Sequence, residues 1–302
     1  MQKTITRELT WLHALISDIA VNSEGGILRG SLDNAHGLSL LQGELHRMTL
    51  QGKTALVTGA SRGIGRATAL ALSETEAHVL VHYGRSAQEA QSLVESIHSR
   101  GGRADAISAD PGTPEGATLL AKQVRSIVGD RLDVLVLNAG ISKAARIADY
   151  TIEEFNNLFA TNVRGPFFVV QQLLPILGEG SNIIVLSSAV VRTVVGKPGL
   201  ENPSILAYAS INRAIETLVR NWAAILGPRG IRVNAVAPGV IDTDMSNFTK
   251  TEAGREVTLG MQALKRIGKP DAIAEVVAFV ASDGARWITG ASIPARSCRK
   301  IR

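Results

Sequence analysis

Cysteine, aromatic residues and long apolar runs are scarce in this sequence. Its 302 residues include one cysteine, Cys298, which excludes an internal disulfide and is typical of a reducing compartment. We therefore expect a cytoplasmic protein. No apolar run reaches the about 18 residues that a membrane-spanning helix needs, so no membrane partner is expected. Aromatic residues make up 4% of the chain and do not interleave with a basic stripe, which argues against nucleic-acid binding.

Strong charge and metal-ligand spacing are missing as well. The formal net charge is +5, and much of the excess lies in the last residues, as in a solvated tail. The six histidines show no ligand spacing, so no metal site is expected, and His78 and His82, which flank a strand segment, are interpreted as surface residues. What the sequence does have is 29 glycines and 45% hydrophobic residues, enough for one sizeable α/β core with many tight turns.

Residues 1–47 differ from the rest of the chain, which we take as one domain at 48–302. Apolar residues fall at helical spacing between Ile5 and Ile19, and a glycine-rich polar stretch follows at 22–36. We therefore expect the first 47 residues to form an extension that is flexible or contains one amphipathic helix.

From Lys53 onward, short apolar runs alternate with helical patterns. Such alternation predicts an α/β protein with a single doubly wound, Rossmann-like parallel sheet and helices on both faces. The site of such a sheet lies beyond the carboxyl ends of its strands, so the residues just after each strand are the candidates. Strands are expected at 54–58, 79–83, 104–109, 134–138, 183–187, 231–237 and 292–293, and helices at 87–99, 115–128, 152–177, 207–226 and 271–281, with a further helix directly after Gly65.

A glycine turn follows the first strand, with glycines at Gly59, Gly63 and Gly65 and a helical pattern after it. Gly59 allows a tight turn, Gly63 lets the backbone approach a phosphate, and Gly65 lets the helix lie close to the sheet. The amides at the start of that helix suit a pyrophosphate, so Ser61, Arg62 and Ile64 are binding candidates too. The alternative is that the glycines only make a turn.

No acidic residue follows the second strand to hold a ribose 2′-hydroxyl, as an NAD-selective fold usually requires. Arg85 and Ser86 stand there instead, and with Arg62 they suit a 2′-phosphate, so we favour NADP over NAD. Alternatively, Arg85 is a solvated turn residue. Asp110 follows the third strand and is placed to accept a hydrogen bond from adenine, or else it is only a turn acid near a helix.

Small and hydroxyl-bearing residues follow the remaining strands. Asn138, Ala139 and Gly140 come after the fourth strand and let a ring and ribose approach the backbone. Ser188 follows the fifth strand, and Tyr208 lies further on. Near a nicotinamide, a serine holds a carbonyl oxygen and a tyrosine gives or takes the proton. The alternatives are a strand-end turn residue for Ser188 and a packed aromatic for Tyr208. The loop after the sixth strand contains Pro238, Gly239, Ile241 and Thr243.

At these residues the chain resembles the short-chain dehydrogenase/reductase family, in the branch that includes 3-oxoacyl-carrier-protein reductases. The stretch from Thr58 to Gly65 is similar to the family's T-G-x-x-x-G-x-G, and 138–140 is similar to its N-A-G. The resemblance implies that Asn162 positions a relay water, that Ser188 and Tyr208 are catalytic, and that the loop with Pro238, Gly239, Ile241 and Thr243 grips the nicotinamide. It further implies a small-molecule carbonyl or alcohol substrate and a homo-oligomer, a tetramer or dimer, built partly from the helices at 152–177 and 207–226.

Three departures from the family pattern stand out. The family's Tyr-x-x-x-Lys ends here in Asn212, which carries no charge to lower the tyrosine pKa. Tyr208 lies 20 positions after Ser188, a long interval, and the excess at 196–203 is expected to form part of the substrate wall. The chain end after Ile288-Thr289-Gly290 is basic and contains Cys298, which we expect to alter a subunit contact.

Two functions are consistent with these observations. One is an NADP(H)-dependent oxidoreductase that interconverts a carbonyl and an alcohol by hydride transfer, with activity reduced by Asn212. The alternative is a catalytically silent dinucleotide-binding homologue that acts as a sensor or an oligomer subunit. The segment at 245–269 is expected to select the substrate, whose identity the sequence leaves open.

Overall fold

The computed structural model describes residues 48–192, 199–200 and 202–297. The predicted extension at 1–47, residues 196–198 and 201 of the wall loop, and Cys298 lie outside the described residues. Seven parallel strands form one sheet in the order β3-β2-β1-β4-β5-β6-β7, which confirms the predicted doubly wound fold. The strands are β1 (Thr54–Val57), β2 (His78–Tyr83), β3 (Arg103–Ser108), β4 (Val134–Leu137), β5 (Asn182–Leu186), β6 (Arg232–Pro238) and β7 (Ser292–Ala295).

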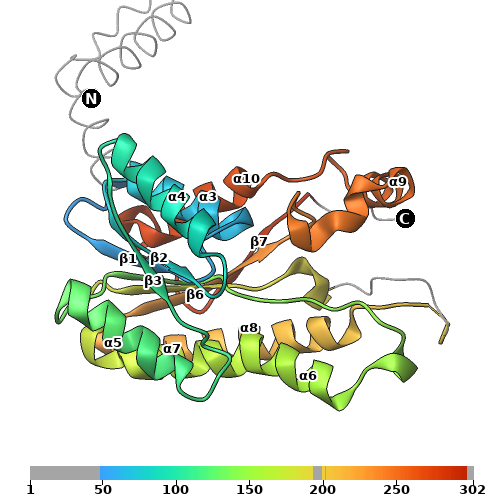
Figure 1. Cartoon of the computed structure of the whole chain (residues 1–302), viewed down its shortest axis with the longest axis horizontal. Helices are drawn as coiled ribbons and strands as arrows, with labels where there is room; N and C mark the ends of the chain where they lie inside the picture. Colours follow the sequence, from blue (N-terminus) through green and yellow to red (C-terminus); the bar gives the residue numbers. More distant parts are fainter. Residues whose placement is uncertain (1–47, 193–198, 201, 298–302) are drawn as a thin grey trace, which may run out of the picture. The chain divides into compact units, whose positions relative to one another are not determined.

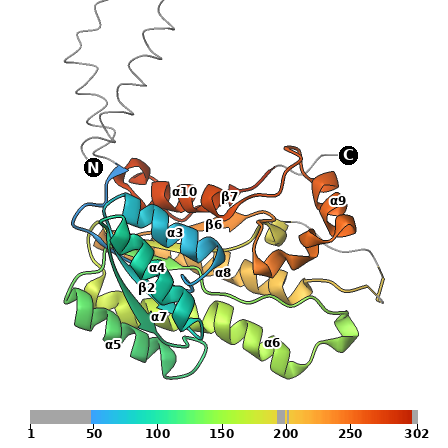
Figure 2. The same cartoon turned by 45° about the horizontal axis from the view of Figure 1, so that its top comes forward.

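Helices cover both faces of the sheet, as Figure 1 shows. One layer contains α3 (Gly63–Glu74), α4 (Ala87–Ser99) and α10 (Pro270–Ala281). The other contains α5 (Gly116–Val128), α6 (Ile152–Phe159), α7 (Gly165–Leu173) and α8 (Leu206–Leu226). Helix α9 (Glu252–Met261), in the segment expected to select the substrate, lies to one side of the first layer (Figure 2).

The two layers bury two apolar clusters, one on each face of the sheet. Leu135 of β4 and Ile183 of β5 face α5, α7 and α8, whereas Val136 and Ile184 face α3 and α10. All four residues of β4 are buried, because a central parallel strand is covered on both faces. Burial of this apolar surface supplies the main driving force for the fold.

The sequence predicts one helical stretch over 152–177, and the structure divides that stretch into several helical segments. It begins with a capping box between Thr151 and Glu154 and then widens into a π turn, η2, at Ala160–Arg164. Helix α7 starts directly after it at Gly165, where a Cβ atom would lie 2.9 Å from the carbonyl oxygen of Pro111. π turns inside helices are frequent at functional sites, because the extra residue leaves a backbone group free of its usual partner.

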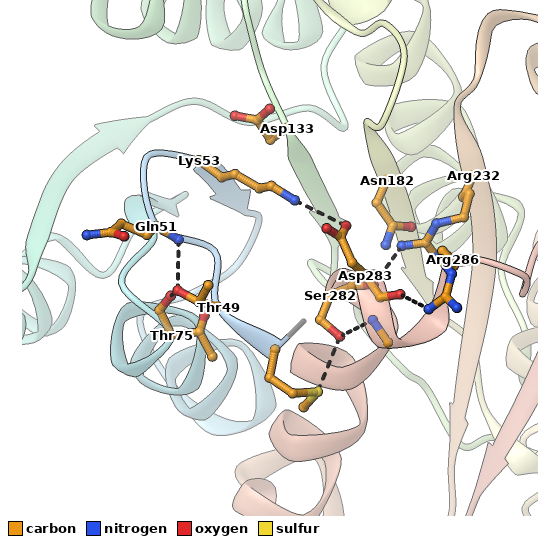
Figure 3. A network of polar contacts seen from close by, with 12 residues as sticks. Thr49, Gln51, Lys53, Thr75, Asp133, Asn182, Arg232, Ser282, Asp283 and Arg286 are labelled. Atoms are coloured by element: carbon orange, nitrogen blue, oxygen red, sulfur yellow. Dashed lines mark hydrogen bonds and ion pairs between the residues drawn. The ribbon is translucent and has the colours of Figure 1, made fainter. Parts of the chain in front are cut away.

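A polar network ties together the amino ends of the strands, on the edge opposite the predicted site (Figure 3). Lys53 directly precedes β1, and its ammonium group lies 3.3 Å from Asp283, just after α10. Asn182 and Arg232 begin β5 and β6, and both donate to the carbonyl oxygen of Val280 near the end of α10. These contacts fix α10 against the sheet. Among the described residues, no helix is both long and apolar enough to cross a bilayer.

Candidate active site

Most of the predicted site residues lie in the segments that follow β1 to β6 at the carboxyl edge of the sheet, whereas Asn162 and Tyr208 come from helical segments. The strand order reverses between β1 and β4, since β1 continues to β2 on one side and β4 to β5 on the other. Dinucleotides bind at such a switch point in doubly wound folds. The glycine turn after β1 and the Asn138–Gly140 segment after β4 flank this point.

The glycine turn is shaped by contacts that only glycine permits. Gly59 has a φ of +63°, and a Cβ atom there would lie 2.9 Å from Cα of Ala139. At Gly65 a Cβ atom would lie 2.3 Å from the carbonyl oxygen of Gly59, so α3 packs directly on the turn. Gly63 also has a positive φ, and its would-be Cβ lies 3.4 Å from the methyl group of Thr243. Two of the predicted segments, the glycine turn and the loop after β6, are therefore in contact.

Asn138 braces the glycine turn. Its side-chain amide donates to the carbonyl oxygens of Thr58 at 2.9 Å and Gly59 at 3.1 Å. The Thr58 hydroxyl in turn accepts hydrogen bonds from the backbone amides of Asn138 and Ala139. The side-chain amide of Asn138 is thus occupied by hydrogen bonds with the backbone of the glycine turn. Ala139 and Gly140 beside it have little or no side chain, as the prediction that a ring and ribose approach the backbone there requires.

His82 was interpreted as a surface residue, and that interpretation is wrong. It is the fifth residue of β2 and only 2% exposed, because β2 lies between β1 and β3 and is covered on both faces. Its Nδ1 accepts a hydrogen bond from the Gly59 amide at 3.1 Å, and its Nε2 lies 3.1 Å from the carbonyl oxygen of Ala109. Burial lowers the pKa of His82 to about 4, against smaller opposing effects of the Ala109 carbonyl and Asp110. His78 lies at the other end of β2, 2.6 Å from Asp105.

The charged candidates occupy the exposed rim. Arg62 precedes α3 and lies 3.7 Å from Asp244, with both side chains well exposed. Arg85 is exposed and Ser86, just before α4, is partly buried. The carboxylate of Asp110 accepts a hydrogen bond from the Gly112 amide at 3.0 Å. This contact is typical of an aspartate in a turn, the alternative to adenine binding given for Asp110 above. Ser61 is buried, and Ile64 is partly exposed at the start of α3.

Ser188, Tyr208 and Asn212 converge at the carboxyl end of β5. Tyr208 lies in the first turn of α8, and its phenol group hydrogen-bonds with the side chains of both Ser188 and Asn212. Burial raises the pKa of Tyr208 above its ordinary value, and the hydrogen bonds of Ser188 and Asn212 offset this only in part. Asn212 is 2% exposed and also donates to the Tyr208 carbonyl oxygen at 2.8 Å.

Asn162 lies in the π turn and faces the segment after β4. Its side chain accepts from the Ile141 amide at 2.9 Å and donates to the Ile141 carbonyl oxygen at 2.8 Å. A Cβ atom at Gly140 would lie 3.4 Å from the same Asn162 oxygen. The asparagine therefore holds the Gly140–Ile141 backbone against the divided helix, and its side-chain groups are occupied.

The loop after β6 packs on the chain's last described residues. The Gly239 amide donates to the Ala295 carbonyl oxygen at 3.1 Å, and a Cβ atom at Gly239 would lie 2.8 Å from Cβ of Arg296. Pro238 ends β6, Ile241 is buried, and Thr243 precedes the short helix η6 (Asp244–Lys250). The part of the basic tail that the structure describes thus supports the loop predicted to grip a nicotinamide.

A separate cavity of about 450 Å³ lies along α8 and β7, and neither Ser188 nor Tyr208 lines it. Arg213, Arg220 and Ser292 contribute to its wall. Glu216 there is buried and pairs with Arg213 at 3.2 Å and with the Ser292 hydroxyl at 2.5 Å. Within the described ranges, no three histidine, cysteine or acidic side chains are grouped as a metal site.

Comparison with known proteins identifies the family. A family model described as Enoyl-(Acyl carrier protein) reductase matches residues 59–295. Versicolorin reductase 1 of Aspergillus parasiticus is 41% identical over 256 residues, with 80% of this chain and 94% of that protein covered. The 3-oxoacyl-[acyl-carrier-protein] reductase FabG of Staphylococcus aureus is 40% identical over 242 residues, with 80% and 95% covered. This chain belongs to the short-chain dehydrogenase/reductase family.

Solved structures of this family share the fold at high similarity. The angucycline C-6 ketoreductase LanV with bound NADP has a TM-score of 0.75 and 39% identity, with 82% of this chain and 95% of that chain covered. The resemblance stated from the sequence motifs is confirmed at the level of the short-chain dehydrogenase/reductase family.

The sequence analysis missed two residues that contact predicted site residues, His82 beside Gly59 and Asp244 beside Arg62. His82 was missed because the residue type of a single histidine in an apolar strand does not show that it faces the neighbouring turn. Its place at the carboxyl end of a central strand was a usable signal, since that edge holds the site. Asp244 was overlooked because its contact with Arg62 joins segments 182 positions apart.

Proposed function

We propose that this protein is an NADP(H)-dependent oxidoreductase that interconverts a carbonyl and an alcohol by hydride transfer. The observation that carries the proposal is the convergence of Ser188 and Tyr208 at the carboxyl end of β5, on the same edge of the sheet as the glycine turn at its switch point. Support also comes from relatives named as reductases and from a neighbour solved with bound NADP. The substrate is a small carbonyl compound or alcohol.

The glycine turn fits a dinucleotide. The first amides of α3, from Gly63 to Gly65, have no partner within their own helix and point out of its amino end. We infer that they receive the pyrophosphate, with Ser61 and Ile64 beside it. Arg62 and Arg85 are exposed at the rim and suit the 2′-phosphate of NADP, since guanidinium groups bind phosphates in a bidentate way. Ser86 and Asp110 line the same rim, and Asn138, Ala139, Gly140, Pro238, Gly239, Ile241 and Thr243 complete the cofactor wall.

The residues of the chain then handle the oxygen and the proton. The bound nicotinamide supplies or accepts the hydride. Ser188 holds the carbonyl oxygen, and Tyr208 donates its proton to that oxygen in reduction or takes it back in oxidation. The side chain of Asn162 is occupied by Ile141, so we infer that the relay water is held by the backbone of the π turn.

Asn212 is proposed to occupy the position of the family's catalytic lysine. An amide hydrogen-bonds with Tyr208 but brings no positive charge to the partly buried phenol, whose pKa stays raised. A phenol of high pKa is a poorly matched acid or base near neutral pH. We therefore expect turnover that is slow for the family, by about tenfold to a thousandfold if a cation is worth ~1–3 pKa units.

The alternative is a silent dinucleotide-binding homologue, which the same missing charge favours. The test is NADPH consumption with a panel of ketones and acyl substrates, with Tyr208→Phe as the matched control. A slow turnover that Tyr208→Phe removes while NADPH still binds supports the enzyme. NADPH binding with no turnover above the Tyr208→Phe background favours the silent homologue.

We also infer a homo-oligomer, a tetramer or dimer, in the cytoplasm. Large apolar side chains are exposed along α6 and α7, including Ile152 at 82%, Phe155 at 44% and Phe168 at 43%. Apolar side chains gathered on one helical layer are typical of a subunit interface, and the family resemblance implies an interface built partly from these helices. The single cysteine of the sequence fits a reducing compartment.

A further inference from the structure

We propose that His82 is a positioning residue that locks one peptide plane of the glycine turn and so sets the affinity for NADP(H). The inference rests on the proposed function only in naming the ligand. His82 lies near the end of β2, and two strands, β1 and β4, separate β2 from β5, the strand that precedes Ser188. It is not one of the predicted site residues.

The peptide group between Thr58 and Gly59 is held at both ends. Its carbonyl oxygen, on Thr58, accepts from the Asn138 side chain at 2.9 Å. Its amide, on Gly59, donates to Nδ1 of His82 at 3.1 Å. The next amide, of Ala60, donates to the His82 backbone carbonyl at 2.8 Å. A glycine at φ +63° has wide conformational freedom, so two side chains are needed to keep this plane from turning.

The partners of His82 dictate its protonation state. A backbone amide can only donate and a backbone carbonyl can only accept, so Nδ1 must be bare toward Gly59 and Nε2 must carry the proton toward Ala109. An added proton on Nδ1 would set two N–H groups against each other and release the Gly59 amide. This hydrogen bond from the Gly59 amide, which we call the lock, therefore exists only while the imidazole is neutral.

Few charged groups act on this imidazole. Its neighbours are the turn after β1, the strands on either side and the segment after β3, and among them Asp110 is the charged group that favours protonation. Burial outweighs Asp110 and the Ala109 carbonyl, so His82 stays neutral to about pH 4. At the pH of ordinary assays the lock is closed.

A rotation of this peptide plane would affect cofactor binding, because the amides that follow it, from Gly63 to Gly65, are predicted to hold the pyrophosphate. These amides are called the phosphate cradle below. If the Thr58–Gly59 plane turns, Gly63 to Gly65 shift with it, since Gly65 packs on the Gly59 carbonyl oxygen. A cradle held in place binds its ligand more tightly than one that must be ordered on binding.

Two variants separate this role from packing. His82→Asn places its amide oxygen where Nδ1 lies, so it can accept from Gly59 but gives up the longer reach of Nε2 to Ala109, whereas His82→Leu fills the space with no hydrogen-bonding group. We expect His82→Leu to raise the Kd for NADP⁺ by about tenfold or more, as for loss of a buried hydrogen bond, and His82→Asn to restore most of the affinity. Isothermal titration calorimetry with NADP⁺ at pH 7.5 measures both affinities.

The wild-type chain supplies a test that needs no variant. Two-bond ¹H–¹⁵N correlation spectra of the imidazole nitrogens should give a neutral ring protonated at Nε2 at pH 5.5, where an ordinary histidine is mostly charged. A charged ring or an Nδ1–H tautomer overturns the proposal, and so does a His82→Leu variant that binds NADP⁺ as the wild type does. If the wild type binds no NADP⁺ although the ring is neutral and protonated at Nε2, the cofactor assignment fails instead, and the affinity role falls with it.

Discussion

Replacing Asn212 by lysine tests the electrostatic reasoning most strongly. Asn212 is buried and hydrogen-bonds with Tyr208, so a lysine there would bring an ammonium group to a phenol whose pKa is shifted by no cation among the described residues. At about 4 Å and an effective dielectric constant of about 20, one unit charge is worth about 4 kcal/mol. That energy corresponds to about 3 pKa units, the upper end of the effect of an adjacent charge.

The sign of the effect follows from which form of Tyr208 works. Alcohol oxidation needs the phenolate as base, so kcat/KM for oxidation should climb about tenfold per pH unit until the pH passes the Tyr208 pKa. Because burial raises that pKa, the wild-type profile should still climb at pH 10. Asn212→Lys should level off at lower pH and be about tenfold to a thousandfold faster near pH 8.

Asn212→Met is the matched control, since it has nearly the length of lysine without the charge. Profiles are recorded from pH 6 to 10.5 with an alcohol chosen from the substrate panel. Equal rates for the lysine and methionine variants would refute the reasoning, because side-chain length would then suffice. A wild type that turns over at an ordinary enzyme rate, ~1–1,000 s⁻¹, would refute it as well.

Three further predictions concern the cofactor rim, the glycine turn and the subunit contact. Arg62→Ala should raise the Kd for NADPH about tenfold and leave that for NADH unchanged, as fluorescence titration would measure; equal changes would contradict a 2′-phosphate contact. Gly65→Ala should cost about 1–3 kcal/mol of unfolding free energy because its Cβ would meet Gly59, whereas Gly260→Ala, with nothing within 4 Å, should cost none. Phe155→Glu should shift the oligomer toward monomer in light scattering, and an unchanged mass would remove α6 from the interface.

The sheet and its helices could be predicted because buried parallel strands are apolar over their whole length. Val134–Leu137 is such a run, and its neighbours in the sheet have the same character. Helix ends were also readable, and α4 at Ala87–Ser99 has the predicted bounds. Period and composition, which are local properties, were enough for these elements.

Features that depend on contacts between distant segments could not be predicted. The division of the helix at Ala160–Arg164 accompanies hydrogen bonds between Asn162 and Ile141, which no local pattern encodes. The burial of His82 depends on strands on both sides of β2, and the bracing role of Asn138 depends on a turn that lies 79 positions away. In each case a polar side chain serves the backbone of another segment, and its residue type alone does not reveal this.

A crystal structure of the chain with NADP⁺ tests the central claim most directly. We predict the pyrophosphate on the amides of Gly63 to Gly65 and the nicotinamide ring facing the hydroxyl groups of Ser188 and Tyr208. A nucleotide bound elsewhere, or a nicotinamide turned away from those two hydroxyls, would contradict the account.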